Sequence, residues 1–415
     1  MTTAIARVRF LDRRTPPHLF TLVAMASLAA LNMNIFLPSL PRMAVDFDAD
    51  YAVVQLTVSG YLATTAVLQL LIGPLSDRYG RRAVMLWALL LFLLATLACA
   101  FAPTLELFLA ARMMQAAVVC GLVLSRAVVR DMHGATGSAS MIGYVTMGMA
   151  LAPMVGPMLG GLIDESHGWR TTFLVLCGFG VLVSALVWAD LGETNLNRSA
   201  SLGAQMRGYP ELFRSRRFWG YAMVAASVSG AFFAFLGGGP YVASNVLGLA
   251  PSELGLYFGF IALGYMMGNF GAARLTPRFG LNPMMLTGAL VAMSGTGLGI
   301  GLFALEIRTP LSFFGPILLV GLGNGLALPS ANAGLLSVRP HLAGSASGLG
   351  GALMIGGGAG LAALAGALLG PDRGAAPLQW LMLAASATGM LAALYVIHVA
   401  RSEALRRVLA ARREA

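Results

Sequence analysis

The sequence has few charged residues and no lysine. Only 11% of its 415 residues are charged, whereas 58% are hydrophobic. Soluble domains carry about 25% charged residues, so this composition excludes an ordinary soluble domain. The three cysteines, Cys99, Cys120 and Cys177, lie in apolar runs without a metal-binding spacing. We therefore expect them to pack in the interior, and we expect no metal and no cofactor.

Uncharged runs recur along the whole chain. Ala83–Ala102 and Leu342–Gly370, for example, contain no acidic or basic residue. Runs of about 20 residues match the hydrocarbon core of a bilayer, in which only helices or closed barrels satisfy the backbone. The ten-residue alternation that is typical of barrel strands is missing. The sequence therefore predicts an all-α integral membrane protein whose surroundings are the lipid bilayer.

The runs predict about twelve transmembrane helices in two pseudo-symmetric halves of six. The expected parts are a cytoplasmic tail (1–16), an N-terminal half (17–190), a cytoplasmic linker (191–217), a C-terminal half (218–399) and a second cytoplasmic tail (400–415). The expected spans are Pro17–Leu40, Val53–Leu75, Ala83–Ala102, Leu105–Val128, Ser138–Ile163, Thr171–Ala189, Phe218–Val242, Leu254–Leu275, Pro283–Leu305, Leu311–Leu336, Leu342–Leu369 and Leu378–Val399.

The 27 arginines predict the orientation. With the N-terminus in the cytoplasm, 22 of them fall in cytoplasmic segments, four fall outside and Arg112 lies within a span. An excess of positive charge in cytoplasmic loops is the general rule, so we expect both termini in the cytoplasm. Because the arginines lie at span ends, the net charge of +10 does not indicate nucleic-acid binding.

A short motif closes the second expected span and recurs 200 residues later. Gly73-Pro-Leu-Ser-Asp-Arg-Tyr-Gly-Arg-Arg82 is echoed by Leu275-Thr-Pro-Arg-Phe-Gly280. The first copy matches G-x-L-[AS]-D-[RK]-x-G-[RK]-[RK], and by this motif the chain resembles the major facilitator superfamily (MFS). Tandem halves allow such transporters to alternate access to a central site.

Further motifs carry the same resemblance. Arg112-Met-Met-Gln115 is similar to the family's R-x-x-Q-G motif, with Ala116 in place of Gly. Ala152–Gly161 is similar to the G-P-x-x-G-G motif of its exporters. Phe36–Pro41 and Ser125–Asp131 resemble the bicyclomycin/chloramphenicol-resistance (Bcr/CflA) drug-efflux subfamily.

The resemblance implies a latch on the cytoplasmic side. It implies that Asp77 docks on the N-terminus of the eleventh span, near Ala343–Ser347, where the helix dipole favours an acid. It also implies that Arg81 pairs with Asp131, while glycines permit close approach and a tight turn. The alternative is a charged segment that only sets the topology. The expected latch residues are Gly73, Asp77, Arg78, Gly80, Arg81 and Asp131.

The fifth expected span carries a helix-packing motif. Gly156, Pro157, Gly160 and Gly161 lie within ten residues of one another. Small residues let membrane helices approach closely, and the resemblance implies that the partner is the eighth span.

Arg112 is the one always-charged residue deep in a span, a costly position that by default marks function. A side chain that reaches an interface is the alternative reading. The resemblance implies that helices 1, 4, 7 and 10 line a cavity, and for each asparagine a contact between helices is as good an explanation as a contact with substrate. The expected cavity residues are Asn34, Tyr61, Arg112, Gln115, Phe232, Phe235 and Asn332.

The resemblance implies a monomeric exporter of small amphipathic compounds that is driven by proton antiport. The alternative is a uniporter or importer of a neutral or anionic metabolite with weak proton coupling. An intramembrane enzyme is disfavoured because neither a Ser/His/Asp group nor a metal cluster lies at matched depth. A sensor is disfavoured because both tails are short.

The acidic residues depart from the Bcr/CflA pattern, which has Asp where this chain has Asn34. None of the 17 acids lies deep in an expected span. An arginine cannot change protonation in a transport cycle. We therefore expect weak proton coupling or the use of an outer carboxylate such as Glu106, and we expect neutral or anionic substrates to be preferred over cations.

Overall fold

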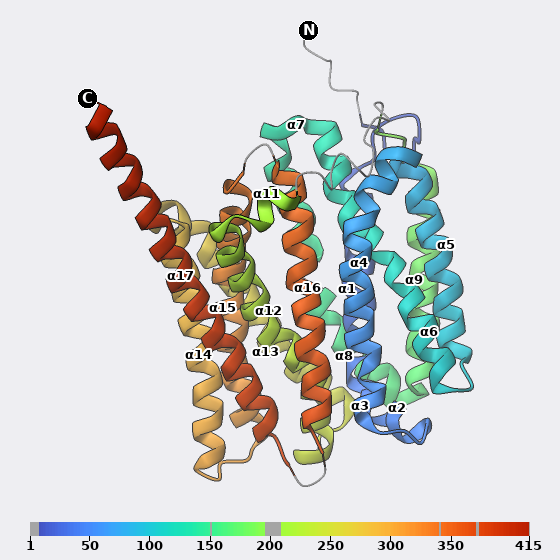
Figure 1. Ribbon diagram of the computed structural model, residues 1–415. Helices are drawn as coiled ribbons and strands as arrows, with labels where there is room; N and C mark the ends of the chain where they lie inside the picture. The colour runs from blue at the N-terminus through green and yellow to red at the C-terminus, as the bar shows by residue number, and fades with distance from the viewer. Residues whose placement is uncertain (1–7, 150–151, 196–208, 340–341, 371–372, 415) are drawn as a thin grey trace. The chain divides into compact units, whose positions relative to one another are not determined.

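The computed structural model describes residues 8–149, 152–195, 209–339, 342–370 and 373–414, and the regular elements in these ranges are all helices (Figure 1). The chain forms two compact units. Unit 1 contains Met1–Gln205 and Pro240–Gly259, and unit 2 contains Met206–Gly239 and Phe260–Ala415. Pro240–Gly259, which the sequence placed in the C-terminal half, therefore packs with the N-terminal helices.

Unit 1 is built around α1, which packs against α7, α8 and α9, while α5 packs against α6 and α9. Leu22, Met25, Phe92, Leu124 and Val128 are fully buried or nearly so in its apolar core. The helices of unit 1 are α1 (Leu19–Asn34), η1 (Leu37–Ser39), α2 (Leu40–Asp46), α3 (Tyr51–Val54), α4 (Leu56–Tyr79), α5 (Arg81–Phe101), α6 (Leu105–Gln115), η2 (Ala116–Val118), α7 (Val119–Met149), α8 (Ala152–His167) and α9 (Trp169–Asp190), with η3 (Val242–Val246) and the start of α13.

In unit 2, α14 packs against α15 and α17, and α16 packs against α15 and α17. Phe218, Val224, Met285 and Ala327 are fully buried in its core. The helices of this unit are α11 (Tyr209–Phe213), α12 (Arg216–Tyr241) up to Gly239, α13 (Pro251–Phe279) from Phe260 onward, α14 (Leu281–Ala304), α15 (Pro310–Ser337), α16 (Ala343–Leu368) and α17 (Ala376–Glu414).

Eleven helical segments in the described ranges are long and apolar enough to cross a membrane. The remaining expected span, Ser138–Ile163, includes residues outside these ranges and corresponds to the end of α7 together with α8. The break expected between Val128 and Ser138 does not occur, because α7 is helical without interruption. The linker expected at 191–217 also lies partly outside the described residues, and its described start packs on unit 1.

The motif at Gly73–Arg82 and its echo at Leu275–Gly280 each form a helix–glycine–helix turn, one in each unit. The second helix does not end at Leu75 as the sequence predicted, since α4 continues to Tyr79 and α5 begins at Arg81. Gly80 has φ 98° and Gly280 has φ 86°, a region that side chains other than glycine rarely adopt. Each glycine N–H also closes the helix before it, on Ser76 O at 3.0 Å and on Thr276 O at 2.8 Å.

Candidate functional site

The polar centre of unit 1 is Arg112, whose side chain is fully buried. Its Nη1 donates to Asn32 Oδ1 at 2.9 Å and to Gln115 Oε1 at 2.6 Å, and its Nη2 donates to Asn32 O at 3.0 Å. Gln115 Nε2 in turn donates to Thr96 Oγ1 at 2.8 Å. The network thus joins α1, α5 and α6.

Two aromatic rings cover the guanidinium group. Arg112 Cζ lies 4.2 Å from the centre of the Phe36 ring and 4.3 Å from the centre of the Tyr61 ring. Both distances fall within the range of cation–π attraction, which is worth about 2 kcal/mol or more when the pair is desolvated. Asn32 Nδ2 also donates to Tyr61 Oη at 3.2 Å, so α4 joins the same network.

The charge of Arg112 has no acidic partner among the described residues of unit 1. Amide oxygens and aromatic faces solvate it instead, and Nε is left without a hydrogen bond. Hydrogen bonds to a charged group contribute about 1.5–3 kcal/mol each, so the three bonds offset much of the cost of burial. The result is a buried positive charge that is held rigidly rather than neutralised.

Three of the seven expected cavity residues, Arg112, Gln115 and Tyr61, therefore meet in one buried network. Asn34 is buried too, but its side chain donates to Ala30 O of its own helix at 2.7 Å. In this structure Arg112, Gln115 and Tyr61 thus bond to other helices of unit 1, whereas Asn34 bonds within its own helix.

The other three expected cavity residues lie in unit 2. Phe235 is fully buried, and its ring packs against Phe313 and Phe314 at 6.4 and 6.1 Å. It is therefore part of an aromatic core of unit 2. Phe232 is half-buried beside Phe233, and Asn332 is exposed.

The latch residues of unit 1 form an ion cluster. Arg81 Nη1 lies 2.5 Å from Asp77 Oδ1, and Arg81 Nε lies 3.1 Å from Asp131 Oδ2. The first nitrogen also donates to Ser76 Oγ at 2.5 Å. Arg78 is exposed, and a Cβ built on Gly73 would meet no described atom of its own unit within 4 Å, so Gly73 is not a close-approach site there.

The start of the linker covers this cluster, which the sequence did not predict. Glu193 Oε1 accepts from Arg81 N at 2.9 Å and so caps α5. Thr194 Oγ1 donates to Asp131 Oδ2 at 3.1 Å, and Asn195 Nδ2 donates to Asp77 O at 2.9 Å. Polar residues after a span are common in any linker, so nothing in their pattern marked them as part of the cluster.

The glycines of α8 allow close contact with two other helices. A Cβ on Gly160 would lie 1.6 Å from Ile35 O, and one on Gly161 would lie 2.2 Å from Pro251 O. The contact of Gly161 is with the start of α13, which corresponds to the eighth expected span. The contact of Gly160, with the end of α1, was not predicted from the sequence. Gly156 and Pro157 are buried in the same helix.

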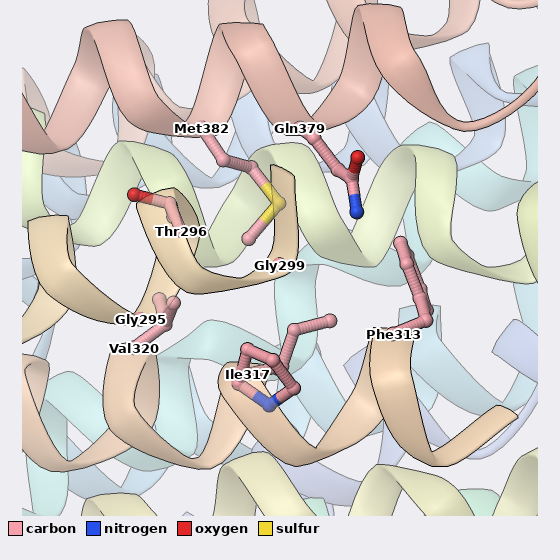
Figure 2. Close-up of a pocket in the computed structure, with 9 residues that line it drawn as sticks. Gly295, Thr296, Gly299, Phe313, Ile317, Val320, Gln379 and Met382 are labelled. Carbon is pink, nitrogen blue, oxygen red and sulfur yellow. The ribbon is translucent and has the colours of Figure 1, made fainter. Parts of the chain in front are cut away.

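A small void in unit 2 lies between α14, α15 and α17 (Figure 2). Its volume is about 10 Å³, and its lining includes Gly295, Phe313 and Met382. A cavity needs about 10–15 Å³ to hold a single water molecule, so this void is a packing defect and not a substrate site.

The motifs, the helix–glycine–helix repeat and the span pattern define a class of membrane transporter. The profile of the Major Facilitator Superfamily matches residues 22–363, and the chain belongs to this family. It is therefore a multi-pass membrane transporter and not an enzyme.

Two relatives are similar to this chain in sequence, and one solved structure shares its fold. An uncharacterised MFS-type transporter of Bacillus subtilis, YdgK, is 32% identical over 90% of this chain and 93% of its own length. A chloramphenicol resistance protein of Pseudomonas aeruginosa is 32% identical over 77% of this chain and 76% of its own. The crystal structure of a D-xylose–proton symporter has a TM-score of 0.71 at 16% identity and covers 91% of this chain and 96% of that one, which shows a shared fold.

Proposed function

We propose that this transporter exports small, neutral or anionic amphipathic compounds across the bacterial inner membrane, by alternating access and in exchange for protons. Similarity to a chloramphenicol resistance protein supports export of drug-like compounds. The exporter-type glycine motif of α8 supports the same direction. The distribution of arginines supports cytoplasmic termini.

The observation that carries the substrate preference is the burial of Arg112 without an acidic partner in the described part of unit 1. At a separation of roughly 10 Å and an effective dielectric of about 20, two unit charges interact by about 2 kcal/mol. A cation that enters near this unit is repelled by that amount, an anion is attracted, and a neutral compound is unaffected. The expected preference for neutral or anionic substrates over cations is about tenfold or more.

Transport in proteoliposomes tests this proposal, with chloramphenicol as the neutral probe and ethidium as the cationic one. The membrane potential and the pH gradient are imposed separately. We expect transport of chloramphenicol to exceed that of ethidium, and the preference to survive in Arg112→Lys, which keeps the charge, but to weaken in Arg112→Met. If the native protein transports ethidium better than chloramphenicol, the proposal that the charge of Arg112 disfavours cations is wrong.

We further propose that the Asp77–Arg81–Asp131 cluster latches the cytoplasmic side by docking on the N-terminus of α16. The partial positive charge of that helix end would hold Asp77. Asp77→Asn should insert normally yet lose most transport, and cysteines at the cytoplasmic mouth should label faster. Arg78→Gln, at an exposed position of the same motif, is the matched control. Equal transport and labelling by all three proteins would reduce the cluster to a topological signal.

A further inference from the structure

Unit 1 contains another buried charge, the carboxylate of Asp164, at the end of the unit where α1 is followed by α2. Asp164 lies near the end of α8, one residue beyond the expected fifth span. Its side chain has no exposed surface. The predicted topology places this end of the unit on the outer side of the membrane.

The carboxylate is only half satisfied. Oδ1 accepts from Arg42 Nη1 at 3.3 Å, and the same nitrogen donates to the backbone oxygen of Asp164 at 2.8 Å. Oδ2 is buried and has no hydrogen bond among the described residues. Ser39 lies beside it, but its buried hydroxyl does not form a hydrogen bond of normal geometry. Leaving a charged oxygen buried and unpaired is costly, and binding a proton removes that cost.

The neighbouring charges do not compensate for this burial. Desolvation raises the pKa of the Asp164 carboxyl above its usual value, Ser39 and Arg42 lower it, and the negative charge of Asp46 adds to the rise. Arg42 is half exposed, which weakens its effect. Asp46 is itself bound by Trp169 Nε1 at 2.7 Å and lies 3.7 Å from Arg170.

Among the described residues, the other elements near Asp164 bring one further cation, Arg170 at the start of α9, and it pairs with Asp46 rather than with Asp164. Neither α1 nor η1 contains a titratable residue. On α8 itself, Glu165 and His167 are exposed. At the start of α13, Glu253 is exposed and caps its own helix through Ala250 N at 2.9 Å. Among the described residues, Arg42 is thus the one cation that pairs with Asp164.

Water has room next to this pair. Arg42 lines a cavity of about 160 Å³ within unit 1, together with residues of α2, η3 and the start of α13. One water needs about 10–15 Å³ by this measure, so the cavity has room for several. A small swing of the half-exposed Arg42 side chain into this water would uncover Asp164 Oδ1. The glycines that contact α1 and α13, Gly160 and Gly161, lie one turn before Asp164 on the same helix.

We propose that Asp164 is a proton-binding site of this transporter, loaded from the outer water through Arg42. Protonation breaks the ion pair, releases Arg42 into the cavity and leaves a neutral α8 end beside η1. The charge change therefore acts at the helix that holds α1 and α13 together. This site replaces the exposed Glu106 as the outer carboxylate that carries the proton. Its use in transport rests on the proposed function, but the titration itself does not.

Infrared difference spectroscopy of the purified full-length protein tests the titration without any substrate. As the pH is lowered, the native protein should gain a protonated-carboxyl C=O band at a pH above the range in which ordinary carboxyl groups bind their protons. The Asp164→Asn variant should lack that component of the band. Glu165→Gln, which alters the adjacent exposed carboxyl, should keep it. Arg42→Gln, at a half-exposed position that should not affect folding, should move the midpoint up by about one pH unit, because an opposite charge lowers a carboxyl pKa.

A transport measurement with the same variants gives the second readout. Chloramphenicol transport driven by a pH gradient should fall about tenfold or more in Asp164→Asn and stay unchanged in Glu165→Gln. Spectra of native protein and Asp164→Asn that titrate alike, or an Arg42→Gln midpoint that does not move, would overturn the proton site. If the band behaves as expected but no probe is transported, the proposed function fails and the proton site stands.

Discussion

Two fully buried carboxylates at opposite ends of unit 1 have very different surroundings. Asp190, at the end of α9, accepts from Leu11 N at 2.7 Å, from His18 N at 2.8 Å and from Thr21 Oγ1 at 2.6 Å. Asp164, at the end of α8, has one long ion pair and one oxygen without any hydrogen bond in the described structure. Equal burial therefore does not mean an equal role.

The number of donors explains the difference. Three short bonds hold the charge of Asp190, and they join the N-terminal segment and α1 to α9. Such a group is an anchor between these segments. Asp164 is held too weakly to anchor anything, so its charge can be removed at little cost to the fold. The comparison teaches that buried acids act as structural ties where donors converge and as switches where donors are missing.

The largest expected effect concerns the contact that holds α8 in place near Asp164. Gly160→Ala would put a methyl group 1.6 Å from Ile35 O, so α1 and α8 would have to separate. We expect a loss of about 3 kcal/mol or more, as for severe overpacking. Thermal unfolding in detergent measures this loss. Gly73→Ala, which meets no described atom of its unit within 4 Å, is the control and should change little; equal losses would contradict the close contact.

The next effect tests the anchor. Asp190→Ala leaves the buried Thr21 hydroxyl and the backbone N–H groups of Leu11 and His18 without their acceptor, at a cost of about 1 kcal/mol or more for the buried hydroxyl. We expect a destabilisation of about 2–4 kcal/mol and faster proteolysis of the segment before α1. Asp190→Asn keeps an acceptor oxygen and should lose less. A melting temperature unchanged by Asp190→Ala would remove the distinction between the two ends.

The smallest expected effect is the stability change caused by removing the charge of Asp164. Asp164→Asn should change the stability at pH 7 by less than about 1 kcal/mol, because it removes a weakly paired buried charge. Since burial raises the pKa of Asp164 in the folded chain, the native protein binds this proton more strongly than the unfolded chain does. Its stability should therefore rise as the pH falls from the folded-state pKa toward the ordinary value near 4.

Melting curves of native protein and Asp164→Asn between pH 7 and pH 5 measure this difference. The gain on acidification should be smaller in Asp164→Asn than in the native protein. A larger gain in the variant would show that Asp164 is an ordinary, well-paired carboxylate.

Much of the fold could be predicted from the sequence because the bilayer simplifies the problem. A run such as Ala83–Ala102 can only be a helix in lipid, and α5 spans Arg81–Phe101. The glycine turn at residue 80 and the Arg81–Asp131 pair also agree with expectation. Helix ends were predicted less well, as α4 and α7 show, because polar residues near the interface can continue a helix.

The sequence by itself determined that the chain is a helical membrane transporter and that Arg112 is its unusual intramembrane charge. Both conclusions follow from the order of apolar runs, motifs and charged residues along the chain. Only the tertiary structure decided what surrounds each charge. Asn32, Phe36 and Tyr61 reach Arg112 from other segments of the chain, and Asp164 differs from Asp190 only in the donors that its neighbours bring. Burial and hydrogen bonding depend on residues that are far apart in sequence, so no local pattern could have separated the anchor from the switch.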